Sequence, residues 1–148
     1  MAGPEQYLRV VFAGLEFLLP SSASFAIEQR DGLIVNDSGA GSTVAWWETR
    51  GKRLPAYHLD GELNPVRNDD WQRAVFLNAQ PQPIGLAANE IQLLTRTDVR
   101  VEPFHPLGQV PTRGGQLFSA AWVQGAEVTL VFEPHALATY LLTVGEGA

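Results

Sequence analysis

Apolar and polar residues alternate in short runs along most of the chain, which is the pattern of β-strands with one buried face. Residues 7–13 form the first run, Gly14 marks a turn and residues 15–19 form the second run, so the pattern predicts an opening hairpin. Three further strands are predicted at residues 32–35, 43–49 and 52–59. Because Pro55 has no backbone N–H to donate, the last of these is expected to lie at a sheet edge or to break at that residue.

A polar, turn-rich segment at residues 64–70 is the best candidate for a boundary between two halves. Strands of the second half are predicted at residues 71–79, 83–88, 91–94, 117–124 and 127–132. Residues 99–115 contain three prolines and three glycines and are predicted to form a loop. Helical spacing appears only after Pro134, where the apolar side chains of one face are Leu137, Tyr140, Leu141 and Val144. Many short strands in two groups with one terminal helix indicate two small β-barrels.

Length and composition agree with this β-rich interpretation. The chain has 148 residues, the size of one domain, and 45% of them are hydrophobic. It contains no cysteine, which excludes disulfides, thiolate metal sites and thiol nucleophiles. A net charge of −6 argues against a nucleic acid or an anionic membrane surface as partner. No targeting segment and no apolar stretch of membrane-spanning length is visible, so a cytoplasmic location without membrane insertion is expected.

Candidate chemistry is sparse. His58, Asp60 and Glu62 lie close enough in sequence to suggest metal ligands, but an Asp-Gly pair directly after a strand is ordinary turn chemistry. The turn is therefore the favoured interpretation. No Gly-x-Ser-x-Gly motif is present. We expect no enzymatic activity, no cofactor, no metal and no small-molecule substrate.

The four tryptophans divide into two kinds. Trp71 and Trp122 are expected in the core. Trp46 and Trp47 are adjacent on one strand and must point to opposite faces. One of them therefore covers a second surface, which is either a cleft between the barrels or the contact with a partner.

Four blocks of the sequence, in the same order and at the same distances, resemble the CheW-like coupling proteins of bacterial chemosensory systems. The blocks are residues 11–20, 50–59, 84–91 and 118–137. The resemblance covers about residues 7–142. It implies a single CheW-like domain over residues 1–148, with two five-stranded SH3-like β-barrels packed side by side and a short C-terminal helix. The first barrel is expected at about residues 5–66 with the helix at about 134–144, and the second at about 70–133.

The sequence departs from the family pattern at several surface motifs. The Asn-Leu pair that usually precedes Arg-Gly is replaced by Glu48 and Thr49. Aspartates of two further blocks are replaced by His58 and Asn89, and Ile27 alone remains of the family's Val-x-Glu-Ile signature. The sequence therefore resembles a divergent member.

The resemblance implies a non-catalytic adaptor that links the cytoplasmic tip of a chemoreceptor to the regulatory domain of a CheA-like histidine kinase. The residues expected to bind partners are Arg50, Gly51, Glu48, Trp47, Leu54 and Ile27. Arg50 would offer its guanidinium to a partner carboxylate, unless Glu48 pairs with it inside the free protein. Two alternatives stay open: an auxiliary CheW-like protein of a pilus or biofilm chemosensory system with altered partners, and an unrelated small β-barrel that binds a ligand.

Overall fold

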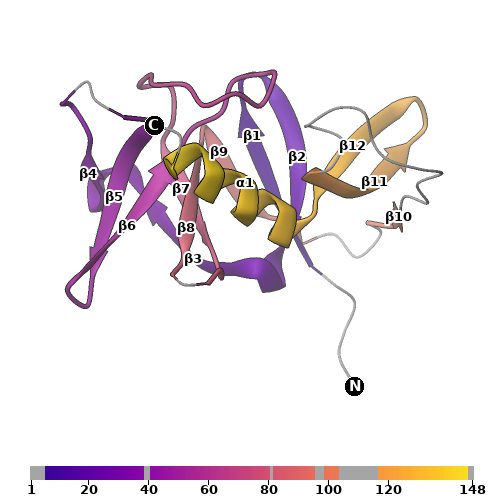
Figure 1. Ribbon diagram of the computed structural model, residues 1–148. Coiled ribbons are helices and arrows are strands. Elements are labelled where there is room, and N and C mark those ends of the chain that lie inside the picture. Colours follow the sequence, from indigo (N-terminus) through magenta and orange to yellow (C-terminus); the bar gives the residue numbers. More distant parts are fainter. Residues whose placement is uncertain (1–5, 39–40, 81, 96–98, 104–116, 147–148) are drawn as a thin grey trace.

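The computed structural model describes residues 6–38, 41–80, 82–95, 99–103 and 117–146. Within these ranges, twelve strands form two six-stranded sheets, and one α-helix packs beside them (Figure 1). No helix in the described part of the chain is long and apolar enough to cross a bilayer.

The first sheet joins the two ends of the chain. Its strands, in spatial order, are β10 (Val101–Pro103), β11 (Phe118–Gln124), β12 (Glu127–Phe132), β2 (Leu15–Pro20), β1 (Tyr7–Phe12) and β9 (Glu90–Leu93). Neighbouring strands are antiparallel except β12 and β2, which run parallel with Leu130 beside Phe17. This parallel pair connects the opening hairpin to the closing one.

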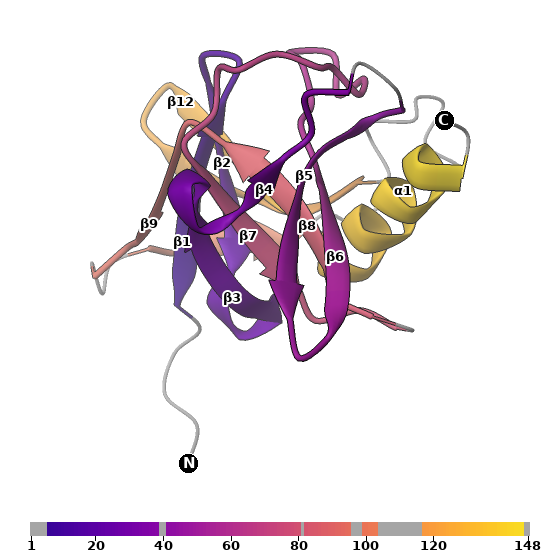
Figure 2. The ribbon, with the colours of Figure 1, turned by 90° about the vertical axis from the view of Figure 1, so that its left-hand side faces the viewer.

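The second sheet is built from the middle of the chain. Its strands, in spatial order, are β3 (Ser24–Gln29), β7 (Arg73–Leu77), β8 (Ile84–Ala88), β6 (Lys52–Tyr57), β5 (Thr43–Thr49) and β4 (Ile34–Val35). Two short 3₁₀ turns, η1 (Ser21–Ala23) and η2 (Arg30–Gly32), flank β3. The β5–β6 hairpin projects at the lower end of this sheet (Figure 2).

The helix α1 (Pro134–Glu146) begins directly after β12. The carboxylate of Glu133 accepts the backbone N–H of Ala136 at 2.6 Å, which caps a free donor of the first turn. Leu137 and Leu141 are fully buried in the core between helix and sheets. The predicted C-terminal helix is therefore confirmed.

A stack of four phenylalanine rings holds the first sheet together. The rings belong to Phe12, Phe17, Phe118 and Phe132, and the centroids of successive neighbours lie 4.9–5.6 Å apart. Such spacings are those of favourable aromatic pairs. The same core cluster includes Val75, Leu77 and Leu86 of the second sheet, so the two sheets share one interior.

The predicted fold class is confirmed: the chain is mainly β, with two sheets and a short C-terminal helix. Each sheet has six strands instead of five, because the short edge strands β4 and β10 add one strand to each.

The predicted division of the strands at residues 64–70 is wrong. The chain passes to the second sheet after β2, at η1, and returns to the first sheet between β8 and β9. The polar segment 64–70 instead connects two strands of the second sheet. Turn composition marks where a chain bends, but it does not determine which strands pair across the bend.

Three local predictions also differ. Strand β6 lies inside the sheet, between β5 and β8, and not at an edge. Because β8 pairs with it only at Ala56 and Tyr57, Pro55 lies in the part of β6 that has a partner strand on one side only. Strand β3 was not predicted. Strand β10 lies inside the predicted loop 99–115, and the rest of that loop from residue 104 lies outside the described residues.

A substitution at Gly85 of β8 tests how closely the side chains of the second sheet are packed. A Cβ at this position would lie 2.8 Å from the Phe76 ring and 2.9 Å from the Cβ of Ala56. We expect Gly85→Ala to lower the free energy of unfolding by about 1–3 kcal/mol, the usual effect of overpacking. Urea denaturation measures this. Gly61→Ala is the control, because a Cβ there meets only ordinary contacts at 3.9 Å. Equal stability of the two variants would contradict the packing.

Candidate functional site

The exposed tip of the β5–β6 hairpin carries the predicted arginine. Arg50 and Gly51 form a two-residue turn in which both backbones are left-handed, with φ of 50° and 77°. This is the turn that matches the twist of paired strands, and it normally favours Asn or Gly at the first position. An arginine held there projects from the end of the sheet. The left-handed conformation alone does not mark a functional residue, because Ala13 adopts it in the β1–β2 turn.

Basic side chains gather around this turn in an otherwise acidic chain. Lys52 and Arg53 follow Arg50, and all three are exposed. Glu48 lies opposite Arg53 in the strand register and pairs with it at 3.7 Å. Glu48 therefore engages Arg53, and the pairing with Arg50 that the sequence suggested is not formed. Arg50 and Lys52 leave the tip with positive charge.

The two adjacent tryptophans point to opposite faces, as predicted. The ring of Trp47 lies 5.1 Å from that of Phe76 and 5.9 Å from that of Phe25, so it covers the interior of the second sheet. The Trp46 ring lies on the outer face, where the guanidinium of Arg53 stands 5.8 Å from its centroid. Both indoles are half-buried. Trp46, Glu48, Arg50, Lys52 and Arg53 together are called the hairpin surface below.

Besides Trp47, two predicted residues lie away from this surface. Leu54 is only 2% exposed, in the core of the second sheet, so its side chain is not accessible to a partner. Ile27 is exposed on β3, but it lies opposite Val75, whose side chain points into the core shared by the sheets. Trp47 packs on Phe76, the next residue along β7, so Ile27 and Trp47 lie on opposite faces of the sheet.

A groove lies where η1 and the β7–β8 connection face the first turns of α1. Its cavity volume is about 660 Å³. The apolar lining includes Leu77, Ala138 and Leu142, and the polar lining includes Asn78 and Thr139. Because β2 and β7 belong to different sheets, the groove lies at their junction.

The candidate metal ligands form a turn. The carboxylate of Asp60 accepts the backbone N–H groups of Glu62 and Asn64 at 2.9 and 3.0 Å. These bonds shape the chain after β6. Across the described ranges, no group of three or more His, Cys, Asp or Glu side chains could hold a metal ion.

Some of these features have no signature in the sequence. Phe25 reaches Trp47 because the register of β3 shifts between Ser24 and Ala26, and such a bulge has no sequence signature here. The residues of the groove come from three separate segments. The basic cluster at Lys52 and Arg53 could have been found, since it concentrates positive charge beside Arg50 in a chain of net charge −6.

Comparison with known proteins supports the fold alone. No protein-family model matches the sequence, and no curated protein matches it. The structure is similar to the scaffolding protein TtCheW from Thermoanaerobacter tengcongensis, with a TM-score of 0.64. The match covers 91% of this chain and 92% of that one at 14% sequence identity. The chain thus has the CheW-like fold that its sequence blocks predicted.

Arg50→Gly tests whether the arginine serves the fold. The left-handed conformation costs a residue with a side chain about 1–2 kcal/mol, and glycine avoids this cost. Glycine also loses more conformational entropy on folding, which lowers the free energy of unfolding by about 0.5–1 kcal/mol. We therefore expect the free energy of unfolding in urea to stay within about 1 kcal/mol of the unsubstituted value. Gly51→Ala, with φ of 77° in open space, should cost about 1 kcal/mol or more. A larger loss for Arg50→Gly than for Gly51→Ala would mean that the arginine side chain holds the hairpin.

Proposed function

We propose that this protein is a non-catalytic adaptor of a bacterial chemosensory pathway, acting in the cytoplasm and linking a chemoreceptor to a histidine kinase. The observation that carries the proposal is the match of nearly the whole chain to a CheW scaffolding protein. Two further features support it. An adaptor needs two separate surfaces for its two partners, and the molecule offers the hairpin surface and the groove.

The hairpin surface suits a partner with exposed carboxylates. Arg50 and Lys52 are exposed and carry no ion pair with another described residue, so their charges are available. The guanidinium fork of arginine fits a carboxylate with two parallel hydrogen bonds. Trp46 beside them adds the half-buried aromatic area that often anchors an interface. We assign this surface to the regulatory domain of a CheA-like kinase.

The groove suits an amphipathic helix, such as one from the cytoplasmic tip of a chemoreceptor. Helices dock by laying an apolar stripe into an apolar groove while polar groups line the rim. Leu77, Ala138 and Leu142 supply apolar lining, and Asn78 and Thr139 supply polar groups.

A second candidate is an auxiliary adaptor of a pilus or biofilm chemosensory system with different partners. Glu48 favours it, because its carboxylate engages Arg53 and reduces the positive charge of the hairpin surface. Co-purification with the kinases encoded in the same genome distinguishes the two candidates.

Arg50→Glu tests the hairpin surface. Reversing this charge should replace attraction by repulsion and weaken binding to the kinase regulatory domain by at least about tenfold, or about 1.4 kcal/mol. Isothermal titration with the purified kinase domain measures the affinity, and thermal unfolding checks the fold. Arg100→Glu is the matched control, since it makes the same charge change at an exposed site outside the hairpin. Equal affinities of the two variants would remove the hairpin surface from the proposal.

Thr139→Arg tests the groove. This exposed residue lines the groove from α1, so a long charged side chain there should fill it and abolish pull-down of the receptor's cytoplasmic fragment. Binding of the kinase domain should be unchanged. Thr143→Arg places the same side chain one turn further along α1, at an exposed site that does not line the groove. Loss of receptor binding with both variants, or with neither, would contradict this assignment.

A further inference from the structure

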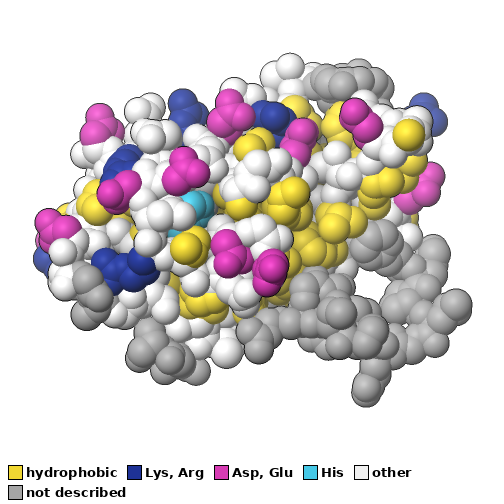
Figure 3. Space-filling view, turned by 90° about the horizontal axis from the view of Figure 1, so that it is seen from above, with side chains coloured by type: hydrophobic (Ala, Val, Ile, Leu, Met, Phe, Trp, Pro, Cys, Tyr) yellow, Lys and Arg dark blue, Asp and Glu magenta, His cyan; other side chains and the backbone are white. Residues whose placement is uncertain are grey.

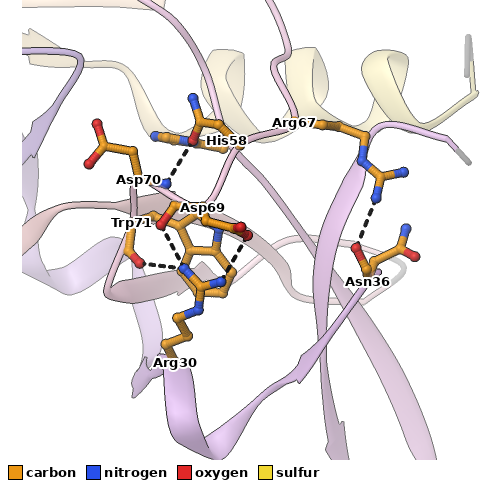
Figure 4. Close-up of polar contacts among 8 residues, drawn as sticks. Arg30, Asn36, His58, Arg67, Asp69, Asp70 and Trp71 are labelled. Atoms are coloured by element: carbon orange, nitrogen blue, oxygen red, sulfur yellow. Dashed lines mark hydrogen bonds and ion pairs between the residues drawn. The ribbon is translucent and has the colours of Figure 1, made fainter. Parts of the chain in front are cut away.

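Residues 59–70, called the strap below, are fastened at many points to the upper end of the second sheet. The guanidinium of Arg67 donates to the backbone oxygen of Asn36 at 2.8 Å (Figure 4). Arg30 donates to the carboxylate of Asp69 at 3.0 Å, and its guanidinium lies 4.5 Å from the centre of the Trp71 ring. The segment predicted to be a boundary is therefore an ordered part of the fold.

The strap is also tied to His58, the residue that follows β6, and to the first sheet. The backbone N–H of Val66 donates to the backbone oxygen of His58 at 2.9 Å. The side-chain amide of Asn89 donates to the backbone oxygen and the carboxylate of Asp70 at 2.7 and 2.9 Å. Asn89 itself donates its backbone N–H to Val11 of β1.

One side-chain contact in the strap fixes the protonation of a buried imidazole. Nδ1 of His58 lies 2.9 Å from Oδ1 of Asn68. The backbone N–H of Asp70 donates to the same oxygen at 3.0 Å, which establishes that this atom is the amide oxygen and not the nitrogen. Nδ1 must therefore carry the proton and donate it, and Nε2 holds the lone pair.

Nε2 has no partner among the described residues. The His58 side chain is 2% exposed, and no donor or acceptor lies within hydrogen-bonding distance of this nitrogen. The neighbour from β1 is the Phe12 ring, edge-on at 6.4 Å, which is apolar. A proton added at Nε2 would create a buried cation whose new N–H has nothing to bind.

Charged groups near the imidazole come from the strap itself. Asp70 lies close enough to favour the cation, and its carboxylate is already engaged by Asn89. Asp60 turns its carboxylate to backbone N–H groups of its own turn. Burial outweighs the opposing effects of Asn68 and Asp70 and lowers the pKa of His58 below its ordinary value of 6.5.

We propose that the His58–Asn68 contact is an acid-sensitive fastening of the strap. The neutral imidazole, protonated at Nδ1, holds Asn68 and with it the strap. When Nε2 takes a proton from water at low pH, the imidazolium leaves its apolar site to become hydrated, and the strap separates from the end of the second sheet. Trp71, which is 1% exposed beneath Arg30, then becomes accessible.

The direction of the pH dependence follows from linkage. His58 binds a proton more weakly in the folded protein than in the open form, so acid favours the open form. The fastening is complete above pH 6.5 and weakens as the pH falls from there toward the lowered pKa.

Amide hydrogen exchange tests the proposal. Between pH 7.5 and 5, the protection of the Val66 and Asp70 amides, corrected for the intrinsic exchange rate, should fall at least about tenfold, while amides of β8 keep theirs. His58→Asn places an amide donor where Nδ1 lies and has nothing to titrate, so its protection should not depend on pH. His135→Asn, which removes an exposed histidine, should keep the acid-dependent loss.

Nitrogen chemical shifts of the unsubstituted protein give an independent measurement that needs no variant. At pH 7.5 they should show His58 protonated at Nδ1 only. A proton on Nε2 at this pH would overturn the proposal. The same acid-dependent loss of protection in His58→Asn, or constant protection in the unsubstituted protein, would also overturn it.

Discussion

The contact on which the rest of this structure depends is the stack of Phe12, Phe17, Phe118 and Phe132. These rings come from the opening and closing hairpins, and they pack where β2 and β12 run parallel. Truncating one buried phenylalanine typically costs about 3–5 kcal/mol, against a total stability of about 5–15 kcal/mol for a domain. Without the stack, only the pairing of β2 with β12 and a smaller apolar cluster around Leu18 and Trp122 would join the opening hairpin to the closing one. The helix that follows β12 would then lose its position, and the groove beside it would not form.

The strands were largely predictable, and their partners were not. Short apolar runs bounded by turn residues located β1, β2, β5 and β12 to within a residue or two, although only β1 among them has strictly alternating buried positions. Pairing depends on contacts between segments about a hundred residues apart, such as Phe17 with Leu130. The pattern of apolar and polar residues within one strand does not specify such distant partners. Dividing the chain at a turn-rich segment therefore gave the wrong strand groups. The family resemblance predicted the fold class correctly because it rests on the order of blocks over the whole chain.

The candidate site shows the same limit at the scale of side chains. Arg50 and Gly51 were found because the strands predicted at 43–49 and 52–59 leave two residues between them, and because the resembled family has an Arg-Gly pair at this place. Leu54 was grouped with them by proximity in sequence, but strand alternation turns its side chain into the core. Ile27 was separated from Trp47 by the register of β3, which no local pattern specifies. The groove could not be predicted from the sequence, because its lining residues come from three segments that are far apart along the chain.

The two sheets also differ in how soon they can form as the chain leaves the ribosome. The second sheet uses only residues 24–88, so all its strands are present once that stretch has been synthesised. The first sheet is complete only after β11 and β12 have been synthesised, about a hundred residues after the opening hairpin. Contacts at this large sequence separation form slowly. During that interval the β2 edge of the opening hairpin lacks the strand β12 that later pairs with it. A nascent chain of this fold thus has a period in which a chaperone, or another copy, competes with its own C-terminal hairpin for the same strand edge.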